Sequence, residues 1–412
     1  MTQPAIVVIG NGQAGFQVAA SLRDGGYDGA IVVLGDESHL PYHRPPLSKA
    51  YLLGSVEDTG LAMRPPAYYA EKRIDMRTNV RATAIDRASK TVTLDDGSTL
   101  EYRHLVIAVG ARNRPLPVAG ADLGGVYFLR TLDEAHALRE RINGAKKVVV
   151  IGAGFIGLEF AAAANQCGAK VTVIDVLDRP MARALSPQMA AIYTREHARK
   201  GVELLFDTQV AKLHGVDGQV QSVETADGKI IEAELVVIGI GVIPNAEIAE
   251  AAGLEVRNGI VVSDLMLTSD PDISAIGDVA AHPNAFAEGN YVRIESIQNA
   301  SDQARCVAAR LNGKPSAYNA VPWFWSDQAD LKLQIAGLTM GFDKVVVRGD
   351  VNSTSCAMFL YRGDHLLGVE TINRPGEHMT ARRLLTNRIS VTPEQAADES
   401  FDLKQLLQPA KA

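Results

Sequence analysis

The stretch IVVIGNGQAG at residues 6–15 decides the fold, because a close copy, VVVIGAGFIG, occupies residues 148–157. Each copy joins an apolar, β-branched run to an alanine-rich run through Gly-x-Gly-x-x-Gly. The first glycine of this pattern allows a tight turn, the second lets backbone approach a pyrophosphate, and the third lets a helix pack on a strand. Each copy therefore predicts a strand, a phosphate-binding loop and a helix, in that order.

An acidic residue follows each copy after a second apolar run. Asp36, with Glu37 as a close rival, follows the run at 31–34, and Asp175 follows the run at 171–174. A carboxylate at this point accepts hydrogen bonds from ribose hydroxyls. Two such sites in one chain indicate that a flavin and a nicotinamide nucleotide are both bound. Two glycine turns without a ligand are the alternative, which the ordered repetition disfavours.

The composition excludes several other classes of protein. The chain has 412 residues, of which 47% are hydrophobic and 22% charged, with a net charge of −7. This length predicts two or three domains, and the negative charge disfavours nucleic acid or an anionic membrane as the main partner. No apolar run reaches the ~20 residues of a membrane span. Since the first strand is expected from about residue 5, we expect no signal peptide and a cytoplasmic location.

The three cysteines limit the redox chemistry. Cys167, Cys306 and Cys356 are far apart and form no Cys-x-x-Cys or Cys-x₄-Cys pair. A flavoprotein disulfide reductase needs such a pair, so this class is disfavoured. The scattered histidines and cysteines also predict no metal or iron–sulfur site.

The order of the segments predicts an α/β fold with two Rossmann-like dinucleotide-binding domains and a small C-terminal α+β domain. Apolar runs that end in glycine, at 105–110 and 235–241, close the two nucleotide-binding units. The expected domains are a discontinuous FAD-binding domain (1–112 and 242–322), an inserted NADH-binding domain (113–241) and the C-terminal domain (323–412). In the last domain we expect strands near 345–347, 358–361 and 366–369, and helices near 381–385 and 403–407.

Four further segments carry a resemblance to a known family. They are PYHRPPLSK at 41–49, LRTLD at 129–133, RIES at 293–296 and PWFWSDQ at 322–328. Together with the two glycine motifs, the chain resembles the FAD-dependent NADH:ferredoxin reductases of bacterial oxygenase systems, which are glutathione-reductase-like flavoproteins. His43 stands where many members of that family have an acid.

The resemblance implies a role for individual residues. The FAD pyrophosphate would lie on Gly10, Gly12, Ala14 and Gly15, and the adenosine ribose on Asp36 or Glu37. Arg44, Pro45 and Lys49 would line the flavin edge, Ala82 and Arg130 the adenosine and diphosphate side, Asp278 the ribityl chain, and Ile297 and Trp325 the ring. The NADH site would contain Gly152, Gly154, Gly157, Glu159, Asp175 and Arg183.

Lys49 and Glu159 are the predicted catalytic residues. Lys49 is the candidate cation at the flavin edge, and Glu159 follows the second glycine motif, where the nicotinamide is expected. We predict an ion pair between them; a solvated lysine and a helix-stabilising acid are the simpler alternative. Asp175 would repel a 2′-phosphate and so favours NADH over NADPH, although Arg179 and Arg183 could bind that phosphate instead.

The resemblance also implies the electron acceptor. It would be a [2Fe–2S] ferredoxin that serves a cytochrome P450. Because such ferredoxins are acidic, a local basic surface is needed, with Arg64, Arg293, Arg305 and Arg310 as candidates. The alternatives are the reductase of an aromatic-ring dioxygenase, a rubredoxin reductase, or an NADH-responsive redox-sensing binding protein.

Overall fold

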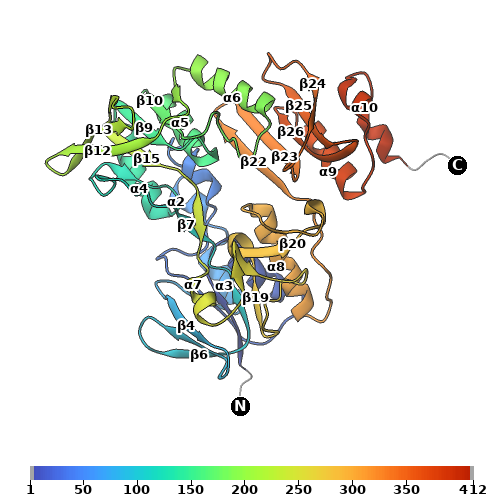
Figure 1. Ribbon diagram of the computed structural model, residues 1–412. Helices are drawn as coiled ribbons and strands as arrows, with labels where there is room; N and C mark the ends of the chain where they lie inside the picture. Colours follow the sequence, from blue (N-terminus) through green and yellow to red (C-terminus); the bar gives the residue numbers. More distant parts are fainter. Residues whose placement is uncertain (1–3, 409–412) are drawn as a thin grey trace. The chain divides into compact units, whose positions relative to one another are not determined.

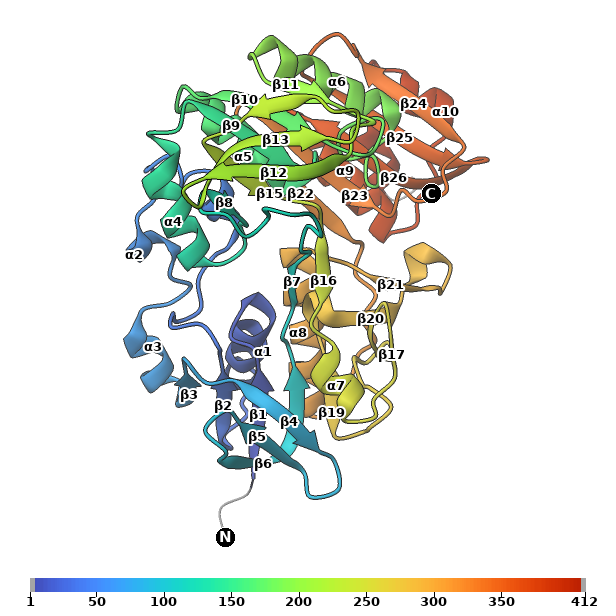
Figure 2. The same cartoon turned by 60° about the vertical axis from the view of Figure 1, so that its left-hand side comes forward.

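The computed structural model describes residues 4–408 and divides into two compact units (Figures 1 and 2). Unit 1 comprises the chain up to residue 43 with residues 58–112 and 243–322. Unit 2 comprises residues 44–57, 113–242 and the chain from residue 323. Residues 44–57 thus pack with the second glycine motif. The predicted division into two nucleotide-binding domains and a C-terminal domain is finer than these two units and stays a prediction.

Unit 1 is built on a seven-stranded sheet of order β3-β2-β1-β6-β5-β4, with β19 paired on β6. Five strands are parallel: β1 (Ala5–Ile9), β2 (Ile31–Leu34), β3 (Ile74–Arg77), β6 (Thr99–Ile107) and β19 (Ile273–Ala275). The antiparallel strands β5 (Thr91–Leu94) and β4 (Ala82–Asp86) extend this sheet from the beginning of β6. The apolar runs of β1 and β2 are almost completely buried, as expected for central parallel strands.

Two long helices of unit 1 pack against each other. They are α1 (Gln13–Asp24), which follows the first glycine motif, and α8 (Ile297–Leu311). A second sheet contains β17 (Val256–Arg257), β18 (Gly259–Val261), β20 (Ala280–Pro283) and β21 (Tyr291–Arg293). The shorter helices are α2 (Asp58–Leu61), α3 (Pro66–Glu71) and α7 (Glu247–Ala251). The strands β7 (Ala111–Asn113) and β16 (Val242–Pro244) form a two-stranded ribbon.

Unit 2 contains a second parallel sheet, of order β11-β10-β9-β15-β8. Its strands are β11 (Glu203–Leu205), β10 (Lys170–Ile174), β9 (Lys147–Ile151), β15 (Leu235–Ile238) and β8 (Val126–Tyr127). The associated helices are α4 (Leu132–Ile142), α5 (Phe155–Gln166) and α6 (Pro187–Arg199). An antiparallel sheet of β12 (Val210–Val216), β13 (Gln219–Thr225) and β14 (Ile230–Glu232) shares a buried apolar cluster with this sheet.

The C-terminal part of unit 2, coloured orange to red in Figure 1, is an antiparallel sheet of order β22-β23-β26-β25-β24. Its strands are β22 (Trp323–Gln328), β23 (Leu331–Gly337), β24 (Lys344–Gly349), β25 (Cys356–Arg362) and β26 (His365–Ile372). The helices α9 (Pro375–Thr386) and α10 (Pro393–Ala397) and the 3₁₀ turn η4 (Leu403–Leu407) follow. The strands and helices predicted for this part are confirmed. Within residues 4–408, no helix is long and apolar enough to cross a membrane.

Candidate functional site

The first glycine loop lies between β1 and α1 in unit 1. Gly10 has a φ of +105°, and a Cβ there would lie 2.3 Å from the Ala108 carbonyl oxygen. A Cβ on Gly15 would lie 1.8 Å from the carbonyl oxygen of Gly10. Any larger residue at either position would therefore collide with backbone. These two glycines are required by the fold itself.

The second glycine loop, in unit 2, repeats this geometry. Gly152 has a φ of +108°, and a Cβ there would lie 2.4 Å from the Gly239 carbonyl oxygen. A Cβ on Gly157 would lie 2.0 Å from the carbonyl oxygen of Gly152. The two motifs therefore fold in the same way, each between a buried parallel strand and a helix.

The middle glycine of each loop is different, because the fold does not require it. Gly12 and Gly154 are the N-caps of α1 and α5, with ordinary φ values of −71° and −76°. A Cβ on Gly12 would have no atom of residues 4–408 within 4 Å, and one on Gly154 would approach the Gly239 oxygen to 3.8 Å. Each loop thus leaves open space beside the helix N-terminus, where a pyrophosphate binds. The backbone of each loop therefore fits the pyrophosphate of one dinucleotide.

The predicted ribose-binding acids of unit 1 lie just beyond β2. Asp36 is exposed and forms an ion pair with Arg81 at 3.1 Å, while Glu37 accepts a 2.5 Å hydrogen bond from the Tyr42 hydroxyl. Ala82 begins β4 on the same sheet. Asp36 is thus the more accessible carboxylate of the two.

Asp278 and Ile297 lie elsewhere in unit 1, around α8. Asp278 is in a 3₁₀ turn (Gly277–Val279) that is anchored by a 2.7 Å hydrogen bond from the Gly277 N–H to Gln303 Oε1. Ile297 is the first residue of α8. The turn that holds Asp278 packs against α8, and Ile297 begins that helix.

Asp175 folds back over the second glycine loop. Its carboxylate accepts hydrogen bonds from the Ala153 N–H at 2.6 Å and the Leu177 N–H at 2.8 Å. Each carboxylate oxygen has further lone pairs and can still accept a ribose hydroxyl. Arg183 is exposed, and Arg179 forms an ion pair with the neighbouring Asp178.

Lys49 and Glu159 form the predicted ion pair, with Lys49 Nζ 3.1 Å from Glu159 Oε1. Lys49 directly follows a 3₁₀ turn (Pro45–Ser48), and Glu159 is the fifth residue of α5, beyond the first turn. The Glu159 side chain is only 3% exposed. Burial raises the pKa of Glu159, whereas Lys49 and two serine hydroxyls act in the opposite direction. The prediction of the pair is confirmed, and the simpler alternative of a first-turn acid does not apply.

Two serines that sequence reasoning did not single out complete the surroundings of Glu159. The Ser326 hydroxyl donates to Oε1 at 2.6 Å and the Ser48 hydroxyl to Oε2 at 2.5 Å. Asp327 Oδ2 lies 4.0 Å from Lys49 Nζ. Ser48 directly precedes Lys49 in the chain, and Ser326 directly follows Trp325. This adjacency to predicted site residues was the indication in the sequence that the two serines belong to the site.

The remaining predicted residues of unit 2 lie around the 3₁₀ turn 45–48, before α4 and on β22. Arg44 donates a 2.7 Å hydrogen bond to the carbonyl oxygen of Arg130, and Pro45 begins the turn that ends at Ser48. Trp325 lies on β22, with its ring centroid 5.5 Å from that of Trp323. Trp323 in turn lies under the Arg382 guanidinium at 4.3 Å. This stacking favours a packing role for Trp323.

The predicted site residues thus form two groups. Unit 1 brings together the first glycine loop, Asp36, Glu37, Ala82, Asp278 and Ile297. Unit 2 brings together the second glycine loop, Asp175, Arg183, Arg44, Pro45, Lys49, Arg130, Glu159 and Trp325.

Among the arginines considered for partner binding, Arg310 is half-buried and donates to Ser274 at 2.6 Å. Its assignment to an exposed docking surface is therefore wrong.

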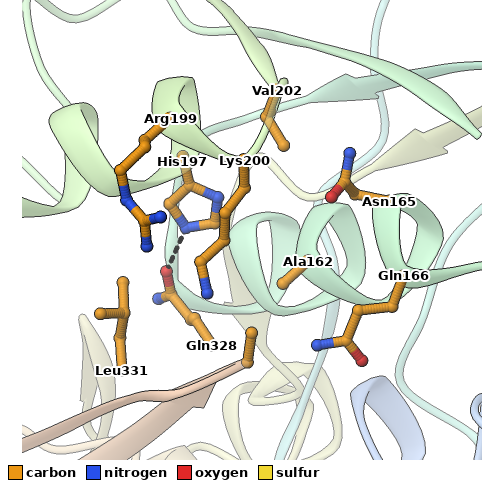
Figure 3. A pocket seen from close by; sticks show the side chains of 10 residues that line it. Ala162, Asn165, Gln166, His197, Arg199, Lys200, Val202, Gln328 and Leu331 are labelled. Atoms are coloured by element: carbon orange, nitrogen blue, oxygen red, sulfur yellow. Dashed lines mark hydrogen bonds between the residues drawn. The ribbon is translucent and has the colours of Figure 1, made fainter. Parts of the chain in front are cut away.

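A cavity of about 270 Å³ in unit 2 was not predicted (Figure 3). It is lined by residues of α5, by the end of α6, and by the turn from β22 to β23. The buried His197 forms a 2.8 Å hydrogen bond between its Nε2 and Gln328 Oε1 at this cavity. The predicted site residues are not among its lining side chains.

Comparison with known proteins identifies the family. Residues 4–304 match the pyridine nucleotide-disulphide oxidoreductase family, and residues 323–407 match the reductase C-terminal domain. The chain belongs to this family of flavoprotein oxidoreductases. Rhodocoxin reductase of Rhodococcus erythropolis is 50% identical over 400 residues, which is 97% of this chain and 93% of that protein.

Two solved structures are similar over almost their whole length. The ferredoxin reductase for the CYP199A2 system from Rhodopseudomonas palustris has a TM-score of 0.96 at 48% identity, and covers 98% of this chain and 99% of its own. The reductase in the covalent putidaredoxin reductase–putidaredoxin complex has a TM-score of 0.97 at 41% identity over 100% of both chains. The chain is therefore a member of the NAD(H)-dependent ferredoxin and rubredoxin reductases, and its cofactors are FAD and NAD(H).

Proposed function

We propose that this flavoprotein oxidises NADH and passes the electrons singly to a [2Fe–2S] ferredoxin that serves a cytochrome P450. FAD, when bound, accepts electrons in pairs as hydride and returns them one at a time. The acceptor is supported by similar proteins that are named for rhodocoxin, for putidaredoxin and for the CYP199A2 system. The residues of the site do not distinguish which oxygenase receives the electrons, because a dioxygenase reductase or a rubredoxin reductase would need the same internal chemistry.

The Lys49–Glu159 pair is the observation that carries the catalytic part of this proposal. Glu159 lies one turn beyond the open N-terminus of α5, the end of the helix that fits the NADH pyrophosphate. Lys49 supplies a positive charge at a site from which water is largely excluded, where a charge acts more strongly than in bulk water. Glu159 holds this ammonium group at 3.1 Å. We assign Lys49 to the flavin edge and Glu159 to the nicotinamide side.

The other predicted residues take supporting roles in this proposal. We assign the FAD pyrophosphate to the first glycine loop, its ribose to Asp36, and its ribityl chain to Asp278. We assign NADH to the second glycine loop and Asp175. We also propose a cytoplasmic location, since Cys167, Cys306 and Cys356 are unpaired thiols, as is usual in a reducing compartment.

The catalytic assignment is tested with Lys49→Met in stopped-flow reduction by NADH. Removing the cation leaves Glu159 buried without its counter-charge, so we expect reduction of the bound flavin to slow by roughly 10- to 100-fold, about 1.4–2.7 kcal/mol. The dissociation constant of NADH should change much less. An unchanged reduction rate would remove Lys49 from the mechanism.

The acceptor is tested with purified [2Fe–2S] ferredoxins, using cytochrome c reduction as the readout. We expect rapid reduction that requires the ferredoxin and weakens as ionic strength rises, as for a transient electrostatic contact. Slow turnover with every ferredoxin, together with a long-lived complex of flavin and nicotinamide, would favour the redox-sensing alternative. Reduction of rubredoxin alone would point to the rubredoxin branch.

A further inference from the structure

The segment at 322–328 contains polar residues that the assignments above leave without a role. On β22, Phe324, Ser326 and Gln328 alternate with their neighbours and so project from one face of the strand. Ser326 and Gln328 are fully buried there. A buried hydroxyl followed by a buried amide on one strand face is costly unless both find partners.

Helix α5 supplies the surface opposite this strand face. Phe155, Glu159 and Ala162 recur at helical spacing on one side of α5, which packs against β22. The Phe155 and Phe324 ring centroids are 4.5 Å apart, and Glu159 contacts Ser326. The four residues from Phe155 to Glu159 along the helix (about 6 Å) nearly equal the two residues from Phe324 to Ser326 along the strand (about 6.6 Å), so these two contacts are in register. Two residues farther along the strand, Gln328 lines the cavity together with Ala162.

A continuous chain of hydrogen bonds follows this line from the cavity to Glu159. His197 Nε2 lies 2.8 Å from Gln328 Oε1, and Gln328 Nε2 lies 3.3 Å from Ser326 Oγ. Ser326 Oγ then lies 2.6 Å from Glu159 Oε1. In Figure 3, His197 and Gln328 face each other at the cavity. The other lining groups include Asn165, Gln166 and Lys200, so the cavity offers polar partners for water and is large enough to hold it.

The donor and the acceptor of each hydrogen bond in this chain follow from the state of the Glu159 carboxylate. A carboxylate paired with Lys49 can only accept, so the Ser326 hydroxyl must donate to it. Ser326 Oγ then accepts from the Gln328 amide, which leaves Gln328 Oε1 to accept from His197. His197 must therefore carry its hydrogen on Nε2. All three donors point toward Glu159, and aligned donors of this kind strengthen one another in a low-dielectric interior.

We propose that Ser326, with Gln328 and His197 behind it, is a positioning set that holds the Glu159 carboxylate ionised and correctly oriented beside Lys49. The set acts on Glu159 from the side opposite Ser48, so the carboxylate is fixed at both oxygens. This inference rests on the role proposed for Glu159. It goes further in naming three residues that determine how Glu159 behaves.

Other titratable groups also face Glu159, and they are the same residues in every variant that tests this proposal. Lys49 and, beyond it, Asp327 lie on one side. Tyr193 of α6 lies on another, and burial, with Asp327 and Glu159 nearby, raises the pKa of its hydroxyl. Because these groups are unchanged in the variants, a difference among variants reports the Ser326 chain.

The main variant is Ser326→Ala, matched with Thr371→Val as the control. Thr371 is as buried as Ser326 and lies on β26 of the same sheet. Its hydroxyl donates to the Gln334 carbonyl oxygen and takes no part in the hydrogen bonds that lead from His197 to Glu159. Both variants delete one buried hydroxyl and should lose similar stability, about 1 kcal/mol. Ser326→Thr, which keeps a hydroxyl, is the rescue variant.

Two readouts distinguish positioning from packing. The first is the pKa of Glu159, measured by carbon-13 NMR of labelled glutamate and assigned with Glu159→Gln. The second is the pH profile of flavin reduction by NADH. We expect Ser326→Ala to raise the Glu159 pKa by about one unit and to move the acidic limb of the reduction profile to higher pH by the same amount, so that reduction on that limb slows by up to roughly tenfold. Gln328→Met should give a smaller change in the same direction, and Thr371→Val no change.

The outcomes separate this inference from the proposed function. If Glu159→Gln reduces as fast as the natural protein, the catalytic role of Glu159 itself fails. If Glu159→Gln is slow but Ser326→Ala and Gln328→Met match Thr371→Val in both readouts, only the positioning set is overturned. Should Ser326→Ala fail to fold, Gln328→Met keeps the serine and answers the same question.

Discussion

The two glycine loops have nearly the same backbone and different side chains around it. In each loop the strand register is equivalent, with Ile9 opposite Leu34 and Ile151 opposite Ile174. The next residue is therefore Gly35 in unit 1 and Asp175 in unit 2, so Asp175 corresponds to Gly35 and not to Asp36. The phosphate site is therefore fixed by backbone, whereas the surroundings of the ribose are set by side chains.

The size of the residue after the first glycine of each loop explains why the acid of unit 1 lies one residue later than that of unit 2. In unit 1 the Asn11 side chain fills the space over Gly35, where a Cβ would lie 2.2 Å from Asn11 Cγ. In unit 2 the equivalent of Asn11 is Ala153, which leaves room for the Asp175 carboxylate to reach the Ala153 N–H. An acid directly after the strand is thus compatible only with a small residue in the loop. Unit 1 places its acid one residue later instead.

The largest expected effect comes from filling the open space in each loop. Gly12→Val and Gly154→Val place methyl groups where a pyrophosphate would lie, at two positions where an added Cβ meets no atom of residues 4–408 closer than 3.8 Å. We expect Gly12→Val to be folded but colourless, with FAD binding weakened at least roughly a thousandfold, about 4 kcal/mol. Gly154→Val should stay yellow and lose NADH binding instead. Absorbance and NADH titration measure both.

The matched controls are Gly10→Val and Gly152→Val, which clash with backbone and should unfold their own unit rather than release one ligand. If Gly12→Val released NADH and kept FAD, the assignment of the two loops would be reversed.

A smaller effect concerns Glu370, a buried acid in unit 2 that touches the N-cap of α6. Its carboxylate accepts from the Ser186 N–H at 2.8 Å and the Ser186 hydroxyl at 2.6 Å, and burial raises its pKa to about 7. Because this pKa lies above the ordinary 4.5, folding takes up a proton between these values. The stabilisation is complete below pH 4.5 and is lost as pH rises through 7, by about 3 kcal/mol.

Glu370→Gln tests this sign by denaturant unfolding at a series of pH values. The amide keeps an acceptor for the Ser186 N–H and carries no charge, so the variant should gain stability over the natural protein at pH 8 and match it near pH 5. Parallel stability curves for the two proteins would show that Glu370 does not titrate in this range.

Sequence reasoning was most successful where one residue's role depends on its neighbours in the chain. The glycine loops and the strands at 345–347 and 358–361 follow from local spacing and alternation, and the structure has them. Residues brought together from distant segments were harder. The Lys49–Glu159 pair was reached through family resemblance, while Ser48 and Ser326 were missed because nothing local indicates which carboxylate a hydroxyl meets.

The limits of local reasoning also appear at Arg310 and Asp175. Arg310 looked like a surface cation, but Ser274 is its partner, and the sequence does not reveal which side of α8 faces the sheet. Asp175 looked like the counterpart of Asp36, because a one-residue shift between two similar loops shows only when the strands are aligned by their pairing.

Asp175→Asn tests the proposed ribose contact at the nicotinamide site. The carboxylate lies over the second glycine loop, where it can accept ribose hydroxyls and repel a 2′-phosphate. We expect the ratio of kcat/KM for NADH to that for NADPH to fall about tenfold, or about 1.4 kcal/mol. Steady-state rates with both nucleotides measure it. Equal kcat/KM values in the natural protein would already refute the proposed preference.

The smallest effect is expected at Asp36, and it decides between Asp36 and Glu37. Asp36 is exposed and paired with Arg81, which is also exposed, an arrangement that contributes little to stability. Asp36→Asn should therefore leave folding intact and weaken FAD binding about threefold, through weaker hydrogen bonds to the ribose. Glu37→Gln should instead disturb the contact with Tyr42 and lower stability with little change in FAD affinity.

If fluorescence titration gave the larger loss of FAD affinity for Glu37→Gln, the ribose would belong to Glu37. The acid of unit 1 would then lie two residues beyond its counterpart Asp175, which would widen the difference between the loops.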